Sequence, residues 1–299
     1  MTLSSPKLPP NRGRLAPSPT GYLHVGHART FHAAWRRARE TGGALVMRME
    51  DLDPERSRAA YAEAALADLR WLGLDWDEGP DVGGPFAPYA QSERGDVYGA
   101  AMERLVAGGF VYLCRCSRRD LAAALSAPHE SGVAQGAIDP LDDEPVYPGT
   151  CRRPLALHAA DFWTSDEAGR EAAANWRFRV PDGEAVEFVD GNLGPQRFVA
   201  GVDFGDFVVW RRDGIPSYQL ACVADDAAMG ITEVVRGADL LKSTARQMLL
   251  NRALGFADPG WFHCGLVVDG SGQRLAKRHD ALSIRALRER GMTAEEVLE

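Results

Sequence analysis

The sequence predicts an α/β fold with a parallel sheet and helices on its faces. Near the amino terminus, a short strand over residues 14–16 leads through a Pro-rich turn into a stretch with apolar residues at helical spacing, 28–39. An apolar run over 44–49 and an amphipathic stretch over 57–72 then repeat this order. Strands and helices that alternate in this way build parallel sheets with helices packed against them, so we expect that arrangement here.

The first half of the chain is expected to hold two strands and three helices. Pro17 and Pro19 stop the first strand, since proline cannot continue a ladder, and Gly42 with Gly43 ends the first helix. A Gly- and Pro-rich loop over 79–88 precedes the third helix. The expected strands cover residues 14–16 and 44–49, and the expected helices cover 28–39, 57–72 and 92–107.

The pattern changes after residue 109. Three cysteines lie between 110 and 154, and 122–146 is rich in Ala, Gly, Pro and acidic residues, which predicts an inserted subdomain with a flexible centre. Strands and helices then resume. The expected strands cover 176–180, 186–189, 207–210, 233–235 and 266–268, and the expected helices cover 218–229, 240–254, 283–290 and 293–298.

The composition is that of an ordinary globular protein. Of 299 residues, 45% are hydrophobic and 25% are charged, and no apolar run is long enough to cross a membrane. Residues 1–12 are polar and Pro-rich without an apolar signal core, so we expect a cytoplasmic protein. The net charge of −8 argues against a generally basic nucleic-acid coat, but it permits a local basic patch. Candidates for such a patch, or for a merely solvated charged face, are Arg36, Arg37, Arg39, Arg115, Arg118 and Arg119.

The turn before the first helix carries the motif HVGH at residues 24–27. A helix start exposes unpaired N–H groups and the positive end of the helix dipole, and it therefore attracts anions. His24 and His27 add donors at this place, and Gly26 leaves room for a flat ring or a backbone to approach. This combination suits a nucleotide triphosphate, whereas the alternative is a pair of surface histidines in a Pro-rich turn.

A second motif lies near the other end, where residues 267–278 have the sequence VVDGSGQRLAKR. This pattern predicts a strand, a glycine turn and a basic loop. Lys277 in such a loop can neutralise a leaving pyrophosphate. A basic turn alone is usually a solvated surface, but the order and separation of the two motifs make each of them more informative.

The cysteines indicate a metal site rather than disulfides. Their number is odd, five, which is poor evidence for a disulfide framework. Cys114, Cys116 and Cys151 bracket one segment with a spacing that suits tetrahedral zinc. A fourth ligand is needed, and a histidine, His129 or His158, is the usual choice. The cysteines expected to pack in the core as small apolar side chains are Cys222 and Cys264.

HVGH near the amino terminus, together with the late lysine loop, resembles the class I aminoacyl-tRNA synthetases, whose signatures are HIGH and KMSKS. Four further blocks resemble the glutamyl group of that family: RLAPSPTG at 14–21, RMEDLD at 48–53, IPSYQLA at 215–221 and DDAAMGITEVVRGAD at 225–239. The resemblance covers nearly the whole chain. It implies the Rossmann-like parallel sheet of a class I synthetase catalytic domain, with a zinc-bearing insertion and a short C-terminal helical segment. The expected division is 12–109 for the first half of the catalytic nucleotide-binding domain, 110–175 for the zinc-binding insertion, 176–268 for the second half, and 269–299 for the lysine loop and C-terminal helices.

The chain stops soon after the lysine loop, where a full glutamyl-tRNA synthetase continues into its anticodon-binding region. Together with its Cys-x-Cys…Tyr-x3-Cys element, it resembles the glutamyl-queuosine tRNA(Asp) synthetases. That family activates L-glutamate with ATP and Mg²⁺ and attaches it to queuosine at the wobble position of tRNA(Asp). Its pattern implies Tyr147 as the fourth ligand of one structural zinc, with His158 as the second choice.

The resemblance also implies roles for single residues. His24, His27 and Lys277 are the catalytic candidates, and with Gly26 they are expected to bind ATP. Arginine grips a carboxylate through its planar fork, and a buried carboxylate holds an ammonium group. The carboxylate of glutamate attacks the α-phosphate, so positioning and charge stabilisation supply the catalysis. The expected glutamate pocket comprises Arg14, Leu15, Ala16, Pro17, Ser18, Glu50, Tyr218 and Arg236.

The late loop departs from the family pattern, since residues 274–278 read RLAKR and keep only the second lysine. Three other interpretations stay open: a truncated glutamyl-tRNA synthetase that charges the 3′ end of tRNA(Glu), a nucleotidyltransferase, and a binding module without catalysis. The residues of the expected glutamate pocket argue against the second, and the intact histidines and lysine argue against the third. Nothing in the sequence demands more than a monomer.

Overall fold

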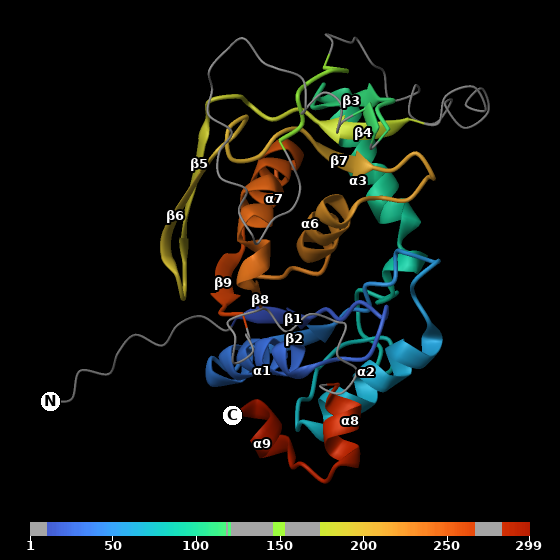
Figure 1. The fold of residues 1–299 in the computed structure, drawn as a ribbon, viewed down its shortest axis with the longest axis vertical. Coiled ribbons are helices and arrows are strands. Elements are labelled where there is room, and N and C mark those ends of the chain that lie inside the picture. The colour runs from blue at the N-terminus through green and yellow to red at the C-terminus, as the bar shows by residue number, and fades with distance from the viewer. Residues whose placement is uncertain (1–10, 118, 121–145, 153–173, 267–282) are drawn as a thin grey trace, which may run out of the picture.

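The structure is a computed structural model that describes residues 11–117, 119–120, 146–152, 174–266 and 283–299 (Figure 1). Its helices are α1 (Val25–Glu40), α2 (Ala59–Trp71), α3 (Gly95–Ala107), α6 (Tyr218–Ala228), α7 (Leu241–Leu254), α8 (Ile284–Glu289) and α9 (Ala294–Leu298), with single 3₁₀ turns at Gln91–Glu93 and Ala238–Leu240. Its strands are β1 (Arg12–Leu15), β2 (Ala44–Met47), β3 (Val111–Cys114), β4 (Asn175–Phe178), β5 (Ala185–Asp190), β6 (Gly194–Val199), β7 (Phe207–Trp210), β8 (Glu233–Gly237) and β9 (Gly260–Cys264).

The strands that carry the site motifs run in parallel. β1 pairs with β2, with Arg14 opposite Val46, and β8 pairs with β9. Thr232, directly before β8, donates its N–H to the Arg12 carbonyl at 2.9 Å and so links β8 to β1. The predicted α/β fold with a parallel sheet is confirmed. Because their carboxyl ends lie at one edge, the segments that follow β1, β2 and β8 come close together.

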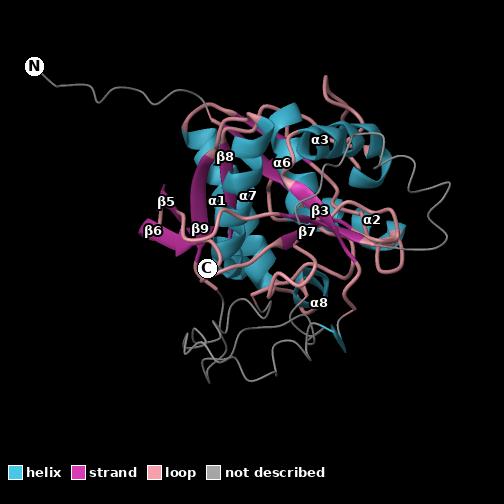
Figure 2. Cartoon of the chain, turned by 90° about the horizontal axis from the view of Figure 1, so that it is seen from above, coloured by secondary structure: helices cyan, strands magenta, loops and turns pink. Residues whose placement is uncertain are grey.

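Helices cover this parallel sheet on two sides. α1 packs against β1 and β8, and α7 packs against β5. In Figure 1, α6 and α7 lie above the β1–β2 pair, and α8 and α9 lie below it. Figure 2 shows the same elements from above, with the β5–β6 hairpin at the left edge and α2, β3 and β7 toward the right. None of the helices in the described ranges is long and apolar enough to cross a membrane.

Two antiparallel parts were not predicted. β3, β4 and β7 form a separate antiparallel sheet, and β5 and β6 form an antiparallel hairpin. This hairpin joins β9 through one parallel pair, Asp190 opposite Trp261. β6 is an edge strand in which Pro195 and Arg197 are exposed and their neighbours are partly buried. An edge strand tolerates a proline, because the missing N–H is not needed for pairing on the open side.

The last strand, predicted at 266–268, is contradicted at its first residue. Leu266 is not in a strand, and residues 267 and 268 lie outside the described residues. The strand is β9, whose Trp261 and His263 lie opposite Val234 and Arg236 of β8. Pairing with β8 therefore identifies a strand in a segment with aromatic and polar residues, which the search for apolar runs did not find.

Two hydrophobic clusters hold the site segments in place. One joins α3, α6 and α7 to β4 and β7, and it includes the fully buried Met102, Leu220 and Leu250. The other joins α1, α2, β1 and β2 to the two C-terminal helices, with Leu15 and Ile284 at its centre. Burial of each such side chain stabilises the fold by about 1.5–3 kcal/mol.

Candidate active site

The HVGH turn forms the amino-terminal end of α1. His24 is the N-cap, and its Nδ1 accepts the Gly26 N–H at 3.1 Å. The His24 N–H donates in turn to Nδ1 of His27 at 3.2 Å, and the two rings lie 3.8 Å apart between centroids. A neutral imidazole that accepts at Nδ1 carries its proton on Nε2. Both rings therefore present an Nε2–H donor at a helix start, which is the chemistry that a phosphate requires.

The carboxyl-terminal segment returns to this turn. Ser283 forms an antiparallel bridge with His24, and the Ile284 N–H donates to the Leu23 carbonyl at 2.8 Å. The chain that follows the lysine loop is thus attached directly beside the HVGH motif. Lys277 itself lies outside the described residues.

Charged side chains gather where β1 and β2 end. The Arg14 Nη1–H donates to the Val235 carbonyl at 2.9 Å, and its Nε lies 3.6 Å from the Asp226 carboxylate. Glu50 accepts from Arg48 at 3.1 Å. Burial raises the pKa of Glu50, while the charges of Arg48 and Arg14 oppose this shift. Such a buried carboxylate is suited to bind a positively charged group of a ligand, such as an ammonium group.

The segment after β1 lies along the segment after β2. The Leu15 carbonyl accepts the Arg48 N–H at 2.8 Å, and the Pro17 carbonyl accepts the Glu50 N–H at 3.0 Å. Leu15 and Pro17 are buried, whereas Ser18 is exposed. The predicted pocket residues Ala16 and Ser18 therefore follow the end of β1, on the segment that leads to the HVGH turn.

Tyr218 is the first residue of α6 and follows the N-cap Ser217, whose hydroxyl accepts the Leu220 N–H at 3.4 Å. Burial raises its pKa well above the usual range, so the phenol stays protonated and is available as a donor. The charges that act on it come from Glu50, Arg14 and Arg236. Cys222, one helical turn later, is buried with its thiol 3.5 Å from Glu50, so the predicted core position of this cysteine is confirmed.

Arg236 of β8 is buried and fully oriented by the chain. It donates from Nε to His263 Nε2 at 3.2 Å, from Nη1 to Gln247 at 2.8 Å and from Nη2 to Thr244 at 2.7 Å. Its guanidinium also lies 5.1 Å from the centroid of the Trp261 ring. Sequence reasoning identified the arginine but missed all of these partners, because none of them belongs to a recognisable block.

The three cysteines of the expected metal site lie together. The ligand atoms of Cys114, Cys116 and Cys151 are all within 4.8 Å of one another, and the Cys116 and Cys151 sulfurs are 3.5 Å apart. The Tyr147 hydroxyl lies 3.4 Å from Cys114 Sγ and 3.7 Å from Cys116 Sγ. Sulfurs bound to one tetrahedral zinc are about 3.8 Å apart, so this donor set fits the ion. The alternatives His129 and His158 lie outside the described residues.

Tyr147 would act as a ligand in its deprotonated form, the phenolate, which a bound cation stabilises. Burial raises its pKa, and so do hydrogen bonds to the neighbouring sulfurs. The Cys151 N–H donates to its oxygen at 2.9 Å, which favours the phenolate. The Arg177 guanidinium lies 4.1 Å from the ring centroid. Gly205 allows the Tyr147 backbone to pass close by, since a Cβ at position 205 would lie 2.6 Å from the Tyr147 backbone nitrogen.

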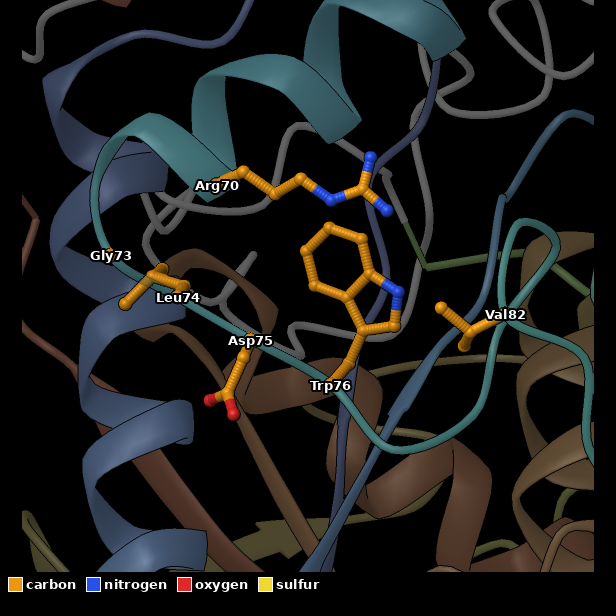
Figure 3. Close-up of a pocket in the computed structure, with 6 residues that line it drawn as sticks. All are labelled: Arg70, Gly73, Leu74, Asp75, Trp76 and Val82. Atoms are coloured by element: carbon orange, nitrogen blue, oxygen red, sulfur yellow. The ribbon is translucent and has the colours of Figure 1, made fainter.

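A pocket of about 370 Å³ lies elsewhere, beside the carboxyl-terminal end of α2 (Figure 3). Figure 3 shows the Arg70 guanidinium over the Trp76 indole, at 5.0 Å from the ring centroid. Asp77, next along the chain, bonds to Leu45 at the start of β2. The pocket therefore lies near the opposite edge of the sheet from the HVGH turn. Its lining residues are Arg70, Gly73, Leu74, Asp75, Trp76 and Val82.

Comparisons with known proteins point to one family. The family described as tRNA synthetases class I (E and Q), catalytic domain, matches residues 11–299. A Glutamyl-Q tRNA(Asp) synthetase of Symbiobacterium thermophilum is 50% identical over 289 residues, which are 96% of this chain and 84% of that protein. Its counterpart in Nitratidesulfovibrio vulgaris is 49% identical over 95% of this chain and 82% of that protein.

Longer proteins match as well. Glutamate–tRNA ligase 2 of Acidithiobacillus ferrooxidans is 44% identical over 95% of this chain, which spans 55% of that ligase. The crystal structure of glutamate–tRNA synthetase from Elizabethkingia anophelis superimposes with a TM-score of 0.73 at 29% identity, over 94% of this chain and 54% of that one. The chain thus spans about half the length of these two proteins.

Proposed function

The chain belongs to the class I tRNA synthetases of the E and Q group, a family of ligases, and we propose that it activates L-glutamate with ATP and transfers it to queuosine at the wobble position of tRNA(Asp). The proposal that the chain activates glutamate rests on the set of charged groups around Tyr218, which are Arg14, Glu50 and Arg236. The names of the two most similar relatives reported above support the proposed transfer to queuosine. We propose that the protein works in the cytoplasm as a monomer.

The pocket residues suit the three charges of glutamate. Arg14 and Arg236 each meet a carboxylate, Glu50 meets the ammonium group, and the neutral Tyr218 donates a hydrogen bond. Bound in this way, one carboxylate oxygen is held for in-line attack on the α-phosphate of ATP, and pyrophosphate leaves. No covalent enzyme intermediate is required.

The HVGH turn supplies the charge stabilisation in this proposal. The Nε2–H groups of His24 and His27 and the start of α1 face the phosphates of ATP, which enters as its Mg²⁺ complex. Lys277 is assigned the neutralisation of the leaving pyrophosphate, and the described chain resumes at Ser283, beside the HVGH turn. A hydroxyl of the queuosine ring then attacks the carbonyl carbon of the resulting anhydride, which breaks the acyl–phosphate bond, forms the ester and releases AMP and a proton.

The zinc has a structural role in this proposal. Cys114, Cys116, Tyr147 and Cys151 would hold it and so join β3 to the segment 146–152. Their distance in sequence from the ATP motifs means that no chemical step needs the metal. When bound, it supplies only the positive charge that holds the ligands together.

Pyrophosphate exchange tests the activation step. The purified protein, given ATP, Mg²⁺ and labelled pyrophosphate without any tRNA, is expected to form labelled ATP only when glutamate is present. Glutamine and aspartate should support less exchange, because glutamine lacks the side-chain carboxylate and aspartate is one methylene too short to make all the contacts at once. Exchange that needs no amino acid would instead indicate a nucleotidyltransferase and would overturn the proposal.

A second candidate function is glutamylation of the 3′ end of tRNA(Glu). It is favoured by the 44% identity to glutamate–tRNA ligase 2 of Acidithiobacillus ferrooxidans over nearly the whole of this chain. Activation would be the same in both cases, so exchange does not separate them. The two functions are separated by which tRNA accepts the glutamate.

A further inference from the structure

The orientation of Arg236 depends on residues from two other elements, β9 and α7. Among the described residues, His263 of β9 and Thr244 and Gln247 of α7 accept three of its five N–H groups. One N–H on each terminal nitrogen is left for a ligand. These acceptors fix the plane of the guanidinium, and a fixed fork is what a bidentate contact to a carboxylate requires.

His263 can accept from Arg236 only in one protonation state. Its side chain is fully buried, and its Nδ1 lies 2.6 Å from the Asp190 carboxylate, while Nε2 faces both Arg236 Nε and the Thr244 hydroxyl, the latter at 3.1 Å. Burial and the Arg236 charge lower the pKa of His263 to about 4. The ring is therefore neutral at pH 7, with its proton on Nδ1 and a lone pair on Nε2. A proton on Nε2 would place an N–H of His263 against the Nε–H of Arg236, and neither group could accept a hydrogen bond.

Asp190 selects this tautomer and holds the ring in place. Its carboxylate also accepts the backbone N–H groups of Asn192 at 3.0 Å, Leu193 at 2.9 Å and His263 at 3.1 Å. These bonds and the bond from the ring lower the pKa of Asp190 although burial opposes the shift. The carboxylate is thus anchored by the turn between β5 and β6 and by β9. Hydrogen bonds thus connect Asp190 to the His263 ring and the ring to Arg236.

We propose that His263, held in one tautomer by Asp190, is a positioning residue that aligns Arg236 with a carboxylate of the bound glutamate. The inference rests on the proposed function and adds to it a pair of residues that no block of the resemblance contains. His263 does not touch the substrate, and it acts on the affinity for glutamate rather than on the chemical step. Its loss should therefore change KM for glutamate and leave kcat and KM for ATP nearly constant.

Two substitutions at one position separate the two bonds of His263. In His263→Asn, the amide can still donate to Asp190, but it is too short to reach Arg236. In His263→Gln, the carbonyl oxygen takes the place of Nε2 and can accept from Arg236. We expect KM for glutamate in the exchange assay to rise about tenfold or more in His263→Asn and to stay within about threefold of the parent in His263→Gln.

A second pair of variants keeps the test independent of folding. Thr244→Val conserves the shape and removes one acceptor of Arg236, so KM for glutamate should rise about three- to tenfold. Asn251→Leu is the matched control, since its buried amide on the same helix bonds Asp258 and not Arg236. That control should lower the melting temperature without changing KM for glutamate.

The outcomes distinguish failure of the positioning role of His263 from failure of the proposed function on which it rests. If the parent shows no glutamate-dependent exchange, the proposed function fails. If the parent is active and His263→Asn and His263→Gln have the same KM for glutamate, the positioning role fails alone. A change in KM for ATP as large as that for glutamate would also contradict it, because it would indicate a general disturbance of the fold.

Discussion

Arg48 shows how single buried charges organise the site. Its side chain is fully buried, and it lies 3.1 Å from Glu50, 2.6 Å from Asp226 and 3.7 Å from Asp225. The guanidinium thereby ties the end of β2 to α6, and removal of one partner from such a group costs about 3–5 kcal/mol. Sequence reasoning placed Glu50 in the pocket through a block of residues. It did not find the role of Arg48, because that role depends on carboxylates as far as 178 residues along the chain.

Asp68 of α2 allows a prediction about stability. It is 5% exposed, one carboxylate oxygen lacks a hydrogen-bond partner in the described structure, and burial raises its pKa from 3.8 to about 6. The pKa of the Asp68 carboxyl is higher in the folded state than in the unfolded state. Its ionisation therefore lowers the free energy of unfolding as the pH rises from about 4 to 6, and the full loss of stability applies above that range. Asp68→Asn should therefore raise the free energy of unfolding at pH 7.5 by about 1–3 kcal/mol and by almost nothing near pH 4.

Urea unfolding at the two pH values measures this difference. Glu63→Gln is the control, because Glu63 is an exposed carboxylate on the same helix. It should change stability by less than about 0.5 kcal/mol at either pH. A gain from Asp68→Asn that is the same at both pH values would show that the cause is packing and not charge.

The elements differ in how far local sequence could predict them. The apolar runs at 44–49 and 207–210 were predicted as strands and correspond to β2 and β7, since a continuous apolar run is typical of a buried strand. The helix predicted at 57–72 corresponds to α2. β6 and β9 were missed because their place depends on partners elsewhere: β6 needs β5, and β9 needs β8 and the Asp190 carboxylate. Periodicity records burial and contains no information about such pairing.

The expected metal site leads to a prediction for β3 and the segment 146–152. Protein purified without chelator should contain about one zinc per chain. Cys114→Ser removes a buried ligand and should abolish the bound zinc, with a lower melting temperature. Cys264→Ser changes a cysteine outside the cluster and should retain the metal.

Metal analysis by mass spectrometry gives the answer directly. Tyr147→Phe should still bind zinc through three thiolates, but more weakly than the parent, and lose it at a lower chelator concentration. Parent protein without zinc, or equal zinc in the parent and in Cys114→Ser, would contradict the assignment.

On the scale of the whole molecule, the acidic chain must meet an acidic tRNA. The arginines of α1 were candidates for a basic patch, but the structure pairs them with carboxylates: Arg37 with Glu233 at 2.6 Å, and Arg39 with Asp77 at 2.8 Å. This face is therefore a partly neutralised, ion-paired surface, which is the other interpretation that the sequence allowed. The fold brings the residues of the proposed glutamate pocket, the HVGH turn and the segment that begins at Ser283 to one edge of the parallel sheet. The sequence motifs predicted these parts, whereas their positions relative to one another required the structure.

The acceptor of the glutamate tests the central claim most directly. Labelled glutamate, ATP and Mg²⁺ are given with the protein to three tRNAs: tRNA(Asp) that contains queuosine, tRNA(Asp) from cells that cannot make it, and tRNA(Glu). We expect label on the first alone, at the anticodon, with the modified ring protected from periodate. Label on tRNA(Glu) that lacks queuosine, at its 3′ end, would contradict the account and make the chain a glutamyl-tRNA synthetase.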